Sequence, residues 1–275
     1  AILGGPGSGK STLVHLIPRF YDVSEGRITI DGHDIRDVTL ASLRKNVGIV
    51  LQDVFVFAAT LRDNIAYGVD GASLEDVVKV AKIAQLHDFI KGLPRGYGTW
   101  VGERGITLSG GQRQRVGIAR ALALGPSYIV CDEPVSALDV SIQAQIINLL
   151  QALQEKENLS MLFISHDLNV VKHLSQRTAV MYLGKIVELA RTEQLNNNSA
   201  HPYTQALLAS KPSLDPRARN RPQPLSGDVP SPLNPPPGCH FHPRCPKVMD
   251  RCKTEVPRPI QLEEGHQVHC HLYDE

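Results

Sequence analysis

A glycine-rich stretch near the start of the chain has the residue types and spacing of a phosphate-binding loop. Residues 4–12 fit the pattern G-x-x-x-x-G-K-[ST]. Such a loop needs glycines because its backbone N–H groups turn inward through conformations that side chains resist. We expect Lys10 to reach the β- and γ-phosphates of a nucleotide and the Ser11 hydroxyl to hold Mg²⁺. A glycine-rich turn that binds nothing is the alternative. The predicted phosphate-binding residues are Gly4, Gly5, Pro6, Gly7, Ser8, Gly9, Lys10, Ser11 and Thr12.

An apolar stretch that ends in two acids could supply catalytic carboxylates. Residues 128–133 read Tyr-Ile-Val-Cys-Asp-Glu, which is typical of a buried strand. Consecutive strand residues point to opposite faces, so the two acids can have separate tasks. We expect Asp132 to order the Mg²⁺ shell and Glu133 to act as general base on a water molecule, which typically contributes about 10²–10⁴-fold. Acids with a purely structural role are the alternative, and Cys131 is interpreted as a small buried hydrophobe.

Two more polar residues directly follow apolar strands. Gln52 comes after the strand predicted at 47–51, and His166 comes after the one at 161–165. In open α/β sheets, ligands bind beyond the carboxyl ends of the strands. We therefore expect Gln52 to contact Mg²⁺ or the attacking water and His166 to contact the γ-phosphate. An ordinary loop residue and a surface histidine are the alternatives.

A second helix start is also prepared for an anion. Residues 108–112 read Leu-Ser-Gly-Gly-Gln and open a helix that we expect to run to about Leu124. Ser109 is the predicted N-cap, and Gly110 and Gly111 would let an anion approach the free N–H groups. One nucleotide does not need two such sites in the same chain.

These residues require a sheet with helices around it. Helical spacing without an intervening strand at 61–66, 73–84 and 86–90 predicts a helical insert, closed by a glycine-rich loop at 101–105. The fold predicted is therefore α/β with a mainly parallel sheet and a helical insert. Strands are expected at 1–3, 27–30, 47–51, 128–133, 161–165, 178–183 and 185–189, and further helices at 11–17, 40–45, 108–124 and 141–154.

The last third of the chain changes in composition. Prolines crowd from Lys211 to Pro237 and predict a stiff, extended connection. Four of the five cysteines follow with the spacing C-x₅-C-x₆-C-x₁₇-C, and five histidines lie in the same segment. In a cytosolic chain such a cluster favours a metal site over disulfides. The four candidate ligands are Cys239, Cys245, Cys252 and Cys270.

Bulk composition argues against some classes of function. The chain has 29 basic and 28 acidic residues and a net charge of +1, so no overall field attracts nucleic acid. No apolar run approaches the roughly 18 residues needed to cross a bilayer, and no signal-peptide pattern is present. We expect a protein of the cytoplasmic side whose membrane role would come through a partner. Because the phosphate loop begins at residue 4, we also expect the N-terminus to be truncated.

Taken in order, these motifs resemble the ATP-binding cassette (ABC) ATPases. The matching features are the phosphate loop, Gln52, LSGGQ at 108–112, the strand ending in Asp-Glu, SALD at 136–139, and His166. The resemblance covers residues 1 to about 190 and implies a P-loop NTPase fold with ATP and Mg²⁺. By the same matching, Glu133 is the general base, His166 the γ-phosphate switch, Gln52 the metal and water residue, and Asp139 a residue of the dimer interface. The aromatic residue that stacks on adenine in this family lies upstream of the phosphate loop and is missing here.

The family also implies that two chains face each other head to tail. Ser109, Gly110, Gly111 and Gln112 of one chain would then face the γ-phosphate held by Lys10 of the other. This arrangement explains why one chain carries two anion sites.

The two halves of the chain resemble different branches of the family. Residues 1 to about 125 are similar to ABC exporter nucleotide-binding domains, most clearly over 47–105. From about residue 126 onward, the chain is similar to ATP-binding subunits of oligopeptide and dipeptide importers, over segments such as 201–208 and 224–232. In some of those importers the four-cysteine tail holds a [4Fe–4S] cluster, and Zn²⁺ is the alternative here. We hypothesise that the chain is a composite joined within 108–124, either natural or from misassembled sequence reads.

The resemblance predicts an ATPase domain at 1–190, with a helical subdomain at about 60–124, and a C-terminal extension at 191–275. It implies an ATP-hydrolysing transporter subunit on the cytoplasmic face of the cell (inner) membrane, with peptides as cargo. The implied partners are a second ABC ATPase chain, permease subunits or a fused membrane domain, and a peptide-binding protein, but no nucleic acid. An exporter domain for lipids, drugs or peptides is one alternative. A soluble cassette ATPase and a module that binds ATP without turnover are two more.

Overall fold

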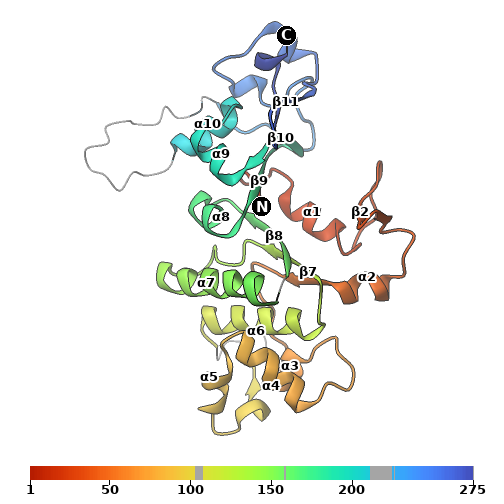
Figure 1. Ribbon diagram of the computed structural model, residues 1–275, viewed down its shortest axis with the longest axis vertical. Coiled ribbons are helices and arrows are strands. Elements are labelled where there is room, and N and C mark those ends of the chain that lie inside the picture. The colour runs from red at the N-terminus through yellow and green to blue at the C-terminus, as the bar shows by residue number, and fades with distance from the viewer. Residues whose placement is uncertain (103–107, 158, 211–224, 226, 275) are drawn as a thin grey trace, which may run out of the picture. The chain divides into compact units, whose positions relative to one another are not determined.

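The computed structural model describes residues 1–275 apart from 103–107, 158, 211–224, 226 and 275 (Figure 1). The chain divides into two units, one made of residues 1–10 and 165–275 and the other of residues 11–164. Within the described residues, no helix is both long and apolar enough to cross a membrane.

The unit of residues 11–164 is built on three parallel strands in the order β8–β7–β4. They are β4 (Val47–Val50), β7 (Tyr128–Asp132) and β8 (Ser160–Ser165). The register pairs Val50 with Cys131 and Cys131 with Phe163, so the three strands end at one edge. The strands predicted from the apolar runs are confirmed. Gln52 and Glu133 follow at the same edge because parallel strands share their carboxyl ends.

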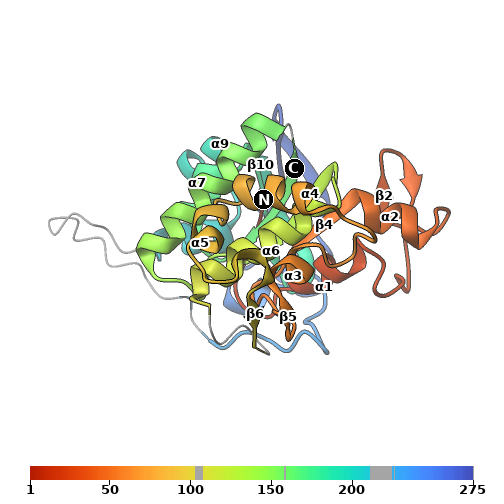
Figure 2. The same ribbon diagram turned by 90° about the horizontal axis from the view of Figure 1, so that it is seen from below.

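The helices predicted for this unit are confirmed, and most of their ends differ from the predicted ones by no more than about three residues. Helix α6 packs against α3, α4 and α7, and Figure 2 shows α3, α4, α5 and α6 grouped together. The helices are α1 (Lys10–Leu16), α2 (Leu40–Asn46), α3 (Leu61–Ile65), α4 (Leu74–Ile83), α5 (His87–Lys91), α6 (Gly110–Ala123) and α7 (Val140–Glu157), with the short 3-10 turn η1 (Gly96–Gly98).

Two short hairpins complete the unit. Strands β2 (Thr29–Ile30) and β3 (His33–Asp34) pair through the predicted turn, where Asp31 and Gly32 both have positive φ. Strands β5 (Ala59–Thr60) and β6 (Trp100–Val101) pair antiparallel at the two ends of the helical insert. The sequence did not predict this second pair because each strand has only two residues. Of the glycine-rich loop expected at 101–105, residues 103–105 lie outside the described residues.

The helical insert is tied to α6 by one buried polar cluster. The Asn64 side chain is fully buried, accepts from Phe57 N at 2.8 Å and donates to the carbonyls of Phe57 and Thr60 at 3.0 Å. Arg120 of α6 donates to the carbonyls of Asn64 and Phe55 at 2.9 Å. Its guanidinium also lies over the Phe57 ring, 5.1 Å from the centroid. Because these bonds join Asn64 to the segment before the insert and Arg120 of α6 to both, the cluster fixes where the insert starts.

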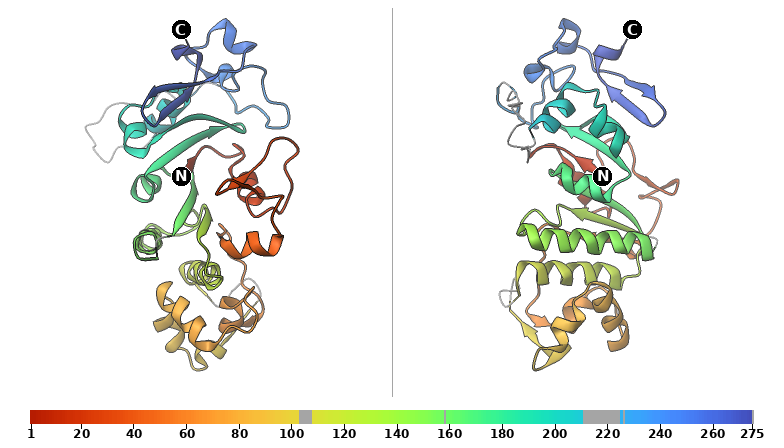
Figure 3. Two further views of the ribbon diagram at one scale, coloured as in Figure 1. Left: turned by 45° about the vertical axis from the view of Figure 1, so that its right-hand side comes forward. Right: turned by 60° about the vertical axis from the view of Figure 1, so that its left-hand side comes forward.

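The other unit has a mixed sheet in the order β11–β12–β10–β9–β1. Strand β1 (Ile2–Leu3) runs parallel to β9 (Arg177–Tyr182), and β10 (Lys185–Arg191) returns antiparallel through Gly184, as predicted. The hairpin of β11 (Pro259–Glu263) and β12 (His266–His269) extends the sheet beyond β10 and was not predicted (Figure 3). The helices are α8 (Leu168–Leu174), α9 (Thr192–Asn197) and α10 (Pro202–Ala209), with the 3-10 turns η3 (His242–Arg244), η4 (Asp250–Lys253) and η5 (His271–Tyr273).

One apolar core joins the start of the chain to its C-terminal third. Leu3 of β1 is fully buried in the same cluster as Tyr182, Tyr203 and Phe241. The Phe241 ring lies 5.2 Å from the Tyr182 ring and 5.4 Å from the Tyr203 ring. The predicted proline-rich connection falls mostly on residues 211–224, outside the described residues, but the segments on either side of it share this core.

Candidate active site

The glycine-rich loop between β1 and α1 closes on the side chain of Lys10. The Lys10 Nζ donates to the carbonyls of Gly4 and Gly5 at 2.8 and 2.9 Å and lies 3.3 Å from Ser8 Oγ. Gly7 and Gly9 have φ of +72° and +97°, the left-handed conformations that a side chain resists. An ammonium group donates at most three hydrogen bonds, so binding a phosphate here means exchanging loop carbonyls for phosphate oxygens.

The back of this loop rests on the β9–β10 turn and on α10. Gly184 N donates to Ser8 O at 2.8 Å, and Gly5 N donates to the Tyr203 hydroxyl at 3.0 Å. A Cβ atom at Gly4 would collide with the backbone carbonyl of Met181. Gly4 is therefore needed for close packing on β9. The contact from Tyr203 has no signal in the sequence, since it joins residues 198 positions apart.

Glu133 has a backbone conformation that singles it out. Its φ is +44°, in the left-handed region, which is uncommon for a residue other than glycine and is often found at functional sites. Glu133 N donates to Ile164 O at 3.1 Å, and Glu133 O accepts from Ser136 N and Oγ at 3.2 and 3.0 Å. These bonds to β8 and to the following turn hold the strained residue in place. Asp132, one residue earlier, is buried with 7% exposure at the end of β7.

The second glycine-rich helix start is a capping box. Gln112 N donates to Ser109 Oγ at 3.3 Å, and Ser109 N donates to Gln112 Oε1 at 2.8 Å, which confirms Ser109 as the N-cap of α6. A Cβ at Gly110 would lie 3.0 Å from Leu138 Cδ2, and one at Gly111 would lie 2.7 Å from Ile142 Cγ2. Both glycines therefore allow close packing against the segment that contains Asp139, a reason that the sequence alone did not reveal.

Asp139 is the cap of the next helix. Its Oδ1 accepts from Ile142 N at 3.0 Å and from Ser141 Oγ at 2.8 Å, at the start of α7. The bond from the Ile142 N–H, followed by that from Ser141, lowers the pKa of Asp139 below its usual value. Asp139 therefore stays ionised near neutral pH and remains exposed at the surface.

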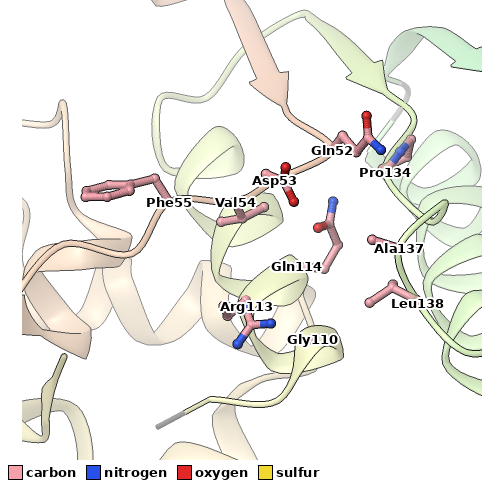
Figure 4. A pocket seen from close by; sticks show the side chains of 10 residues that line it. All are labelled: Gln52, Asp53, Val54, Phe55, Gly110, Arg113, Gln114, Pro134, Ala137 and Leu138. Atoms are coloured by element: carbon pink, nitrogen blue, oxygen red, sulfur yellow. The ribbon is translucent and has the colours of Figure 1, made fainter. Parts of the chain in front are cut away.

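A hollow joins Gln52 to the start of α6 (Figure 4). Its lining comes from three segments, which are the residues after β4 (Gln52 and Asp53), the start of α6 (Gly110 and Arg113) and the turn before α7 (Pro134, Ala137 and Leu138). Gln114 lies between them, is 3% exposed, and donates through Nε2 to Leu51 O at 3.3 Å. This bond connects α6 to the residue directly before Gln52. Gln114 was not among the residues predicted from the sequence, although it stands only two positions after LSGGQ.

His166 is exposed directly after β8, where the sequence placed it. The next residue, Asp167, caps α8 by accepting from Asn169 N at 2.8 Å. His166 belongs to the same unit as residues 4–10. The other unit contains the remaining residues predicted for the ATP site, which are Ser11, Thr12, Gln52, Ser109, Gly110, Gly111, Gln112, Asp132, Glu133 and Asp139.

The clustered cysteines lie in the unit of residues 1–10 and 165–275, and all are free thiols. Cys239 N donates to Cys252 O at 2.9 Å, which brings two of the chain segments together. The pKa of Cys270 is raised to about 11, mainly by burial and to a smaller extent by the charges of the other three clustered cysteines. Across the described part of the chain, no three His, Cys, Asp or Glu side chains are grouped to hold a metal ion.

Comparison with known proteins gives two family matches. Residues 1–136 match the family "ABC transporter", and residues 187–252 match "Oligopeptide/dipeptide transporter, C-terminal region". A protein of Sinorhizobium fredii, named a probable peptide ABC transporter ATP-binding protein, is 44% identical over 98% of this chain and 78% of its own length. An oligopeptide transport ATP-binding protein of Bacillus subtilis is 45% identical over 99% of this chain and 84% of its own.

A solved structure is also similar. A bacterial Atm1-family ABC exporter with ATP bound is 42% identical, with a TM-score of 0.68. The match covers 76% of this chain and 36% of the exporter chain, so this chain spans about a third of that protein.

Proposed function

This chain belongs to the ATP-binding proteins of ABC transporters, and from that premise we propose that it powers the transport of oligopeptides or dipeptides. As a member of this family it is an ATPase that uses ATP and Mg²⁺. The observation that carries the peptide assignment is the identity of 44–45% to peptide transporter subunits over nearly the whole chain. The C-terminal match over residues 187–252 supports the same cargo.

We propose that residues 4–12 hold the phosphates of ATP, with Lys10 on the outer phosphates and Ser11 on Mg²⁺. The positions of Lys10 among the loop carbonyls and of Gly7 and Gly9 at positive φ support this assignment. Bound Mg²⁺ would neutralise charge on the phosphate oxygens. Asp132 and Gln52 would complete its shell, Glu133 would take the proton of the attacking water at its carboxylate, and His166 would contact the γ-phosphate.

As the ATPase of an ABC transporter, the chain works as a dimer with permease partners in the membrane. We propose that Ser109, Gly110, Gly111 and Gln112 of each chain face the γ-phosphate bound by the other, with Asp139 at the interface. The capping box at Ser109 and the packing of both glycines against 138–142 support a preset surface at this helix start. We also place the chain on the cytoplasmic face of the inner membrane, with a peptide-binding protein as a further partner.

We propose an ATPase domain at 1–190, with a helical subdomain at about 60–124, and a C-terminal extension at 191–275. For the cysteines of the extension we propose a [4Fe–4S] cluster, with Zn²⁺ as the alternative. The number of free thiols and the bond between Cys239 and Cys252 support it, but a cluster would have to draw the thiols together. An anaerobic preparation should contain iron and show visible absorption that is lost in Cys245→Ser. Colourless protein without iron would contradict the cluster.

The cargo is tested by uptake of labelled peptides in the source cells. Deletion of the gene should abolish uptake of a labelled dipeptide or tripeptide and leave sugar uptake unchanged. The wild-type gene should restore uptake, and Lys10→Ala should not. Peptide uptake that survives the deletion, with another solute lost instead, would contradict the peptide assignment.

A second candidate function is the ATPase of an exporter, which the 42% identity to the Atm1-family exporter favours. Purification of the native complex separates the two. Separate permease subunits together with a peptide-binding protein would support import, and a membrane domain fused to this chain would support export. One long sequencing read across codons 95–140 would test whether the chain is a composite.

A further inference from the structure

Tyr203, in the C-terminal third of the chain, contacts the phosphate loop from behind. Its hydroxyl accepts the N–H of Gly5 at 3.0 Å. Gly5 is also one of the two residues whose carbonyls accept from Lys10. The two contacts differ in what happens to them when a phosphate enters. The bond from Lys10 must be released, whereas the bond to Tyr203 can persist because it uses the N–H of Gly5 and not the carbonyl that Lys10 contacts.

The tyrosine hydroxyl is held in a fixed position by packing. The Tyr203 residue is 4% exposed, and its ring lies 4.7 Å from the Tyr182 ring and 5.4 Å from the Phe241 ring. A ring enclosed by two other aromatic rings in a close-packed core has little freedom to turn. The acceptor for Gly5 is therefore preset before any ligand binds.

The start of α10 is itself anchored by a buried carboxylate. Glu188 of β10 is fully buried and accepts from Ala200 N at 2.7 Å and from His201 N at 3.0 Å. His266 of β12 lies with Nε2 at 2.8 Å from the same carboxylate. Two backbone N–H groups and one ring nitrogen thus fix the residues directly before Tyr203 to the sheet.

His201 completes the helix start as its cap. Its Nδ1 accepts from Tyr203 N at 3.1 Å. Burial lowers the pKa of His201 to about 3, so the ring is neutral near pH 7 and can act as an acceptor. The three residues of the sequence His-Pro-Tyr at 201–203 together form the start of α10. His201 is the cap, Pro202 lies in the first turn, and Tyr203 contacts the phosphate loop.

A second contact leads from the cysteine-containing segment to the same loop. His240, next to Cys239, lies with Nδ1 at 2.9 Å from Leu183 O. The adjacent Gly184 N donates to Ser8 O of the phosphate loop at 2.8 Å. The extension therefore supports the loop at Gly5 directly and at Ser8 through the β9–β10 turn.

We propose that Tyr203 is a positioning residue for nucleotide binding, through which the C-terminal extension presets the phosphate loop. This inference rests on the proposed role of residues 4–12 in binding ATP. A loop whose backbone is held from outside loses less conformational entropy when it orders around a ligand. His240 supports the same loop through the Leu183–Gly184 turn. Its contribution to nucleotide affinity is smaller than that of Tyr203, because its contact with the loop is indirect.

The test compares Tyr203→Phe with Tyr182→Phe in the full chain. Both substitutions remove one hydroxyl from the same aromatic cluster, but the Tyr182 hydroxyl has no hydrogen-bond partner among the described residues. Calorimetric titration with MgATP should show the Kd raised about threefold to tenfold in Tyr203→Phe, as expected for loss of one neutral hydrogen bond. Tyr182→Phe should keep the wild-type Kd. In turnover assays, KM should rise in Tyr203→Phe while kcat stays unchanged, whereas a merely misfolded fraction would lower kcat.

Equal Kd values for the two variants would overturn the inference. His240→Ala leaves every aromatic ring in place and provides a second test, with a smaller rise in Kd expected and an unchanged value counting against the proposal. Lys10→Ala separates this inference from the proposed function. If Lys10→Ala loses MgATP binding while Tyr203→Phe binds as wild type does, only the positioning role fails. If wild-type chain binds no MgATP, the proposed function fails and the inference with it.

Discussion

The two glycine-rich helix starts of this chain look alike in sequence but use their glycines for different reasons. In the loop at residues 4–10, Gly7 and Gly9 have positive φ and lie in a turn that encloses the Lys10 side chain. At the start of α6, neither Gly110 nor Gly111 has positive φ, and both instead make room for Leu138 and Ile142. The first site is a loop whose carbonyls bind the Lys10 ammonium group, and the second is a close packing contact between the start of α6 and the segment at 138–142. The same glycine-rich composition can therefore belong either to a loop that needs left-handed backbone conformations or to a helix start that needs close packing.

Neither glycine-rich site contains a carboxylate that could take a proton from water, and the proposed general base is Glu133. Glu133→Gln should lower phosphate release by about 10²–10⁴-fold, because the amide cannot take a proton from water. MgATP binding should be kept, since the phosphate loop is unchanged. A malachite-green assay measures turnover, and Glu75→Gln, an exposed position on α4, is the matched control. Unchanged turnover in Glu133→Gln would contradict the assignment.

If the first site is the one that holds the nucleotide, removal of its cation should abolish tight binding. Lys10→Ala should raise the Kd for MgATP by about 100-fold, since hydrogen bonds from a charged donor contribute about 1.5–3 kcal/mol each. Fluorescence titration with a labelled nucleotide measures this. Lys79→Ala, at an exposed position of α4, should bind as wild type does. If Lys10→Ala and Lys79→Ala bound MgATP equally well, the phosphate loop would not be the site that holds the nucleotide.

If the glycines at the start of α6 are needed for packing, the stability lost by substituting one of them should be partly restored by shortening the side chain that it contacts. Gly111→Ala should lower the free energy of unfolding by about 1–3 kcal/mol, because the new Cβ would lie 2.7 Å from Ile142 Cγ2. Gly111→Ala combined with Ile142→Ala should lose less than the sum of the two single changes. Urea denaturation measures all three variants. Simple additivity would show that packing is not the reason for this glycine.

The backbone role of the first site predicts the opposite behaviour. Gly7→Ala should cost about 1–2 kcal/mol of stability through its left-handed conformation alone. Apart from the adjacent Pro6 and Ser8, no atom of the described residues lies within 4 Å of the position where the Cβ at residue 7 would be. We therefore expect no second substitution to relieve this cost. The same urea series should show no rescue from Ser8→Ala. A rescue would mean that steric contact is the cause there as well.

The smallest expected effect concerns the cap beside the second site. The pKa of Asp139 is lowered in the folded chain, so its contribution to stability is present above the unfolded pKa of about 3.9 and is lost as the pH falls through the folded value. Asp139→Asn should therefore be slightly less stable than wild type at pH 7 and closer to it near pH 3. Denaturation midpoints at both pH values check this. A difference that does not depend on pH would contradict the role of the charge.

The features that could be predicted from the sequence depend on residues close together in the chain. The apolar runs that became β4, β7 and β8, the cap at Ser109 and the turn at Gly184 depend on neighbouring residues and are found where the pattern places them. The positive φ of Glu133 could not be predicted because it depends on bonds to Ile164 and Ser136 that form only in the fold. The hairpin of β11 and β12 was missed because its short strands are rich in polar residues.

The contacts that link distant segments had no sequence signal at all. Gln114 meets Leu51 from 63 positions away, and Tyr203 meets Gly5 from 198. Each contact depends on where whole elements pack, which periodicity does not specify. The cysteine cluster shows the converse, since four well-spaced thiols do not by themselves make a ligand group in the described structure.

The most direct test of the account is the mass of the Glu133→Gln chain in solution, measured by light scattering with and without MgATP. The proposed head-to-tail arrangement predicts a shift from monomer to dimer on addition of MgATP, because each nucleotide would be held by the phosphate loop of one chain and by the α6 start of the other. The shift should be absent in Glu133→Gln combined with Ser109→Arg. A wild-type chain that hydrolyses ATP at full rate as a strict monomer would contradict the account.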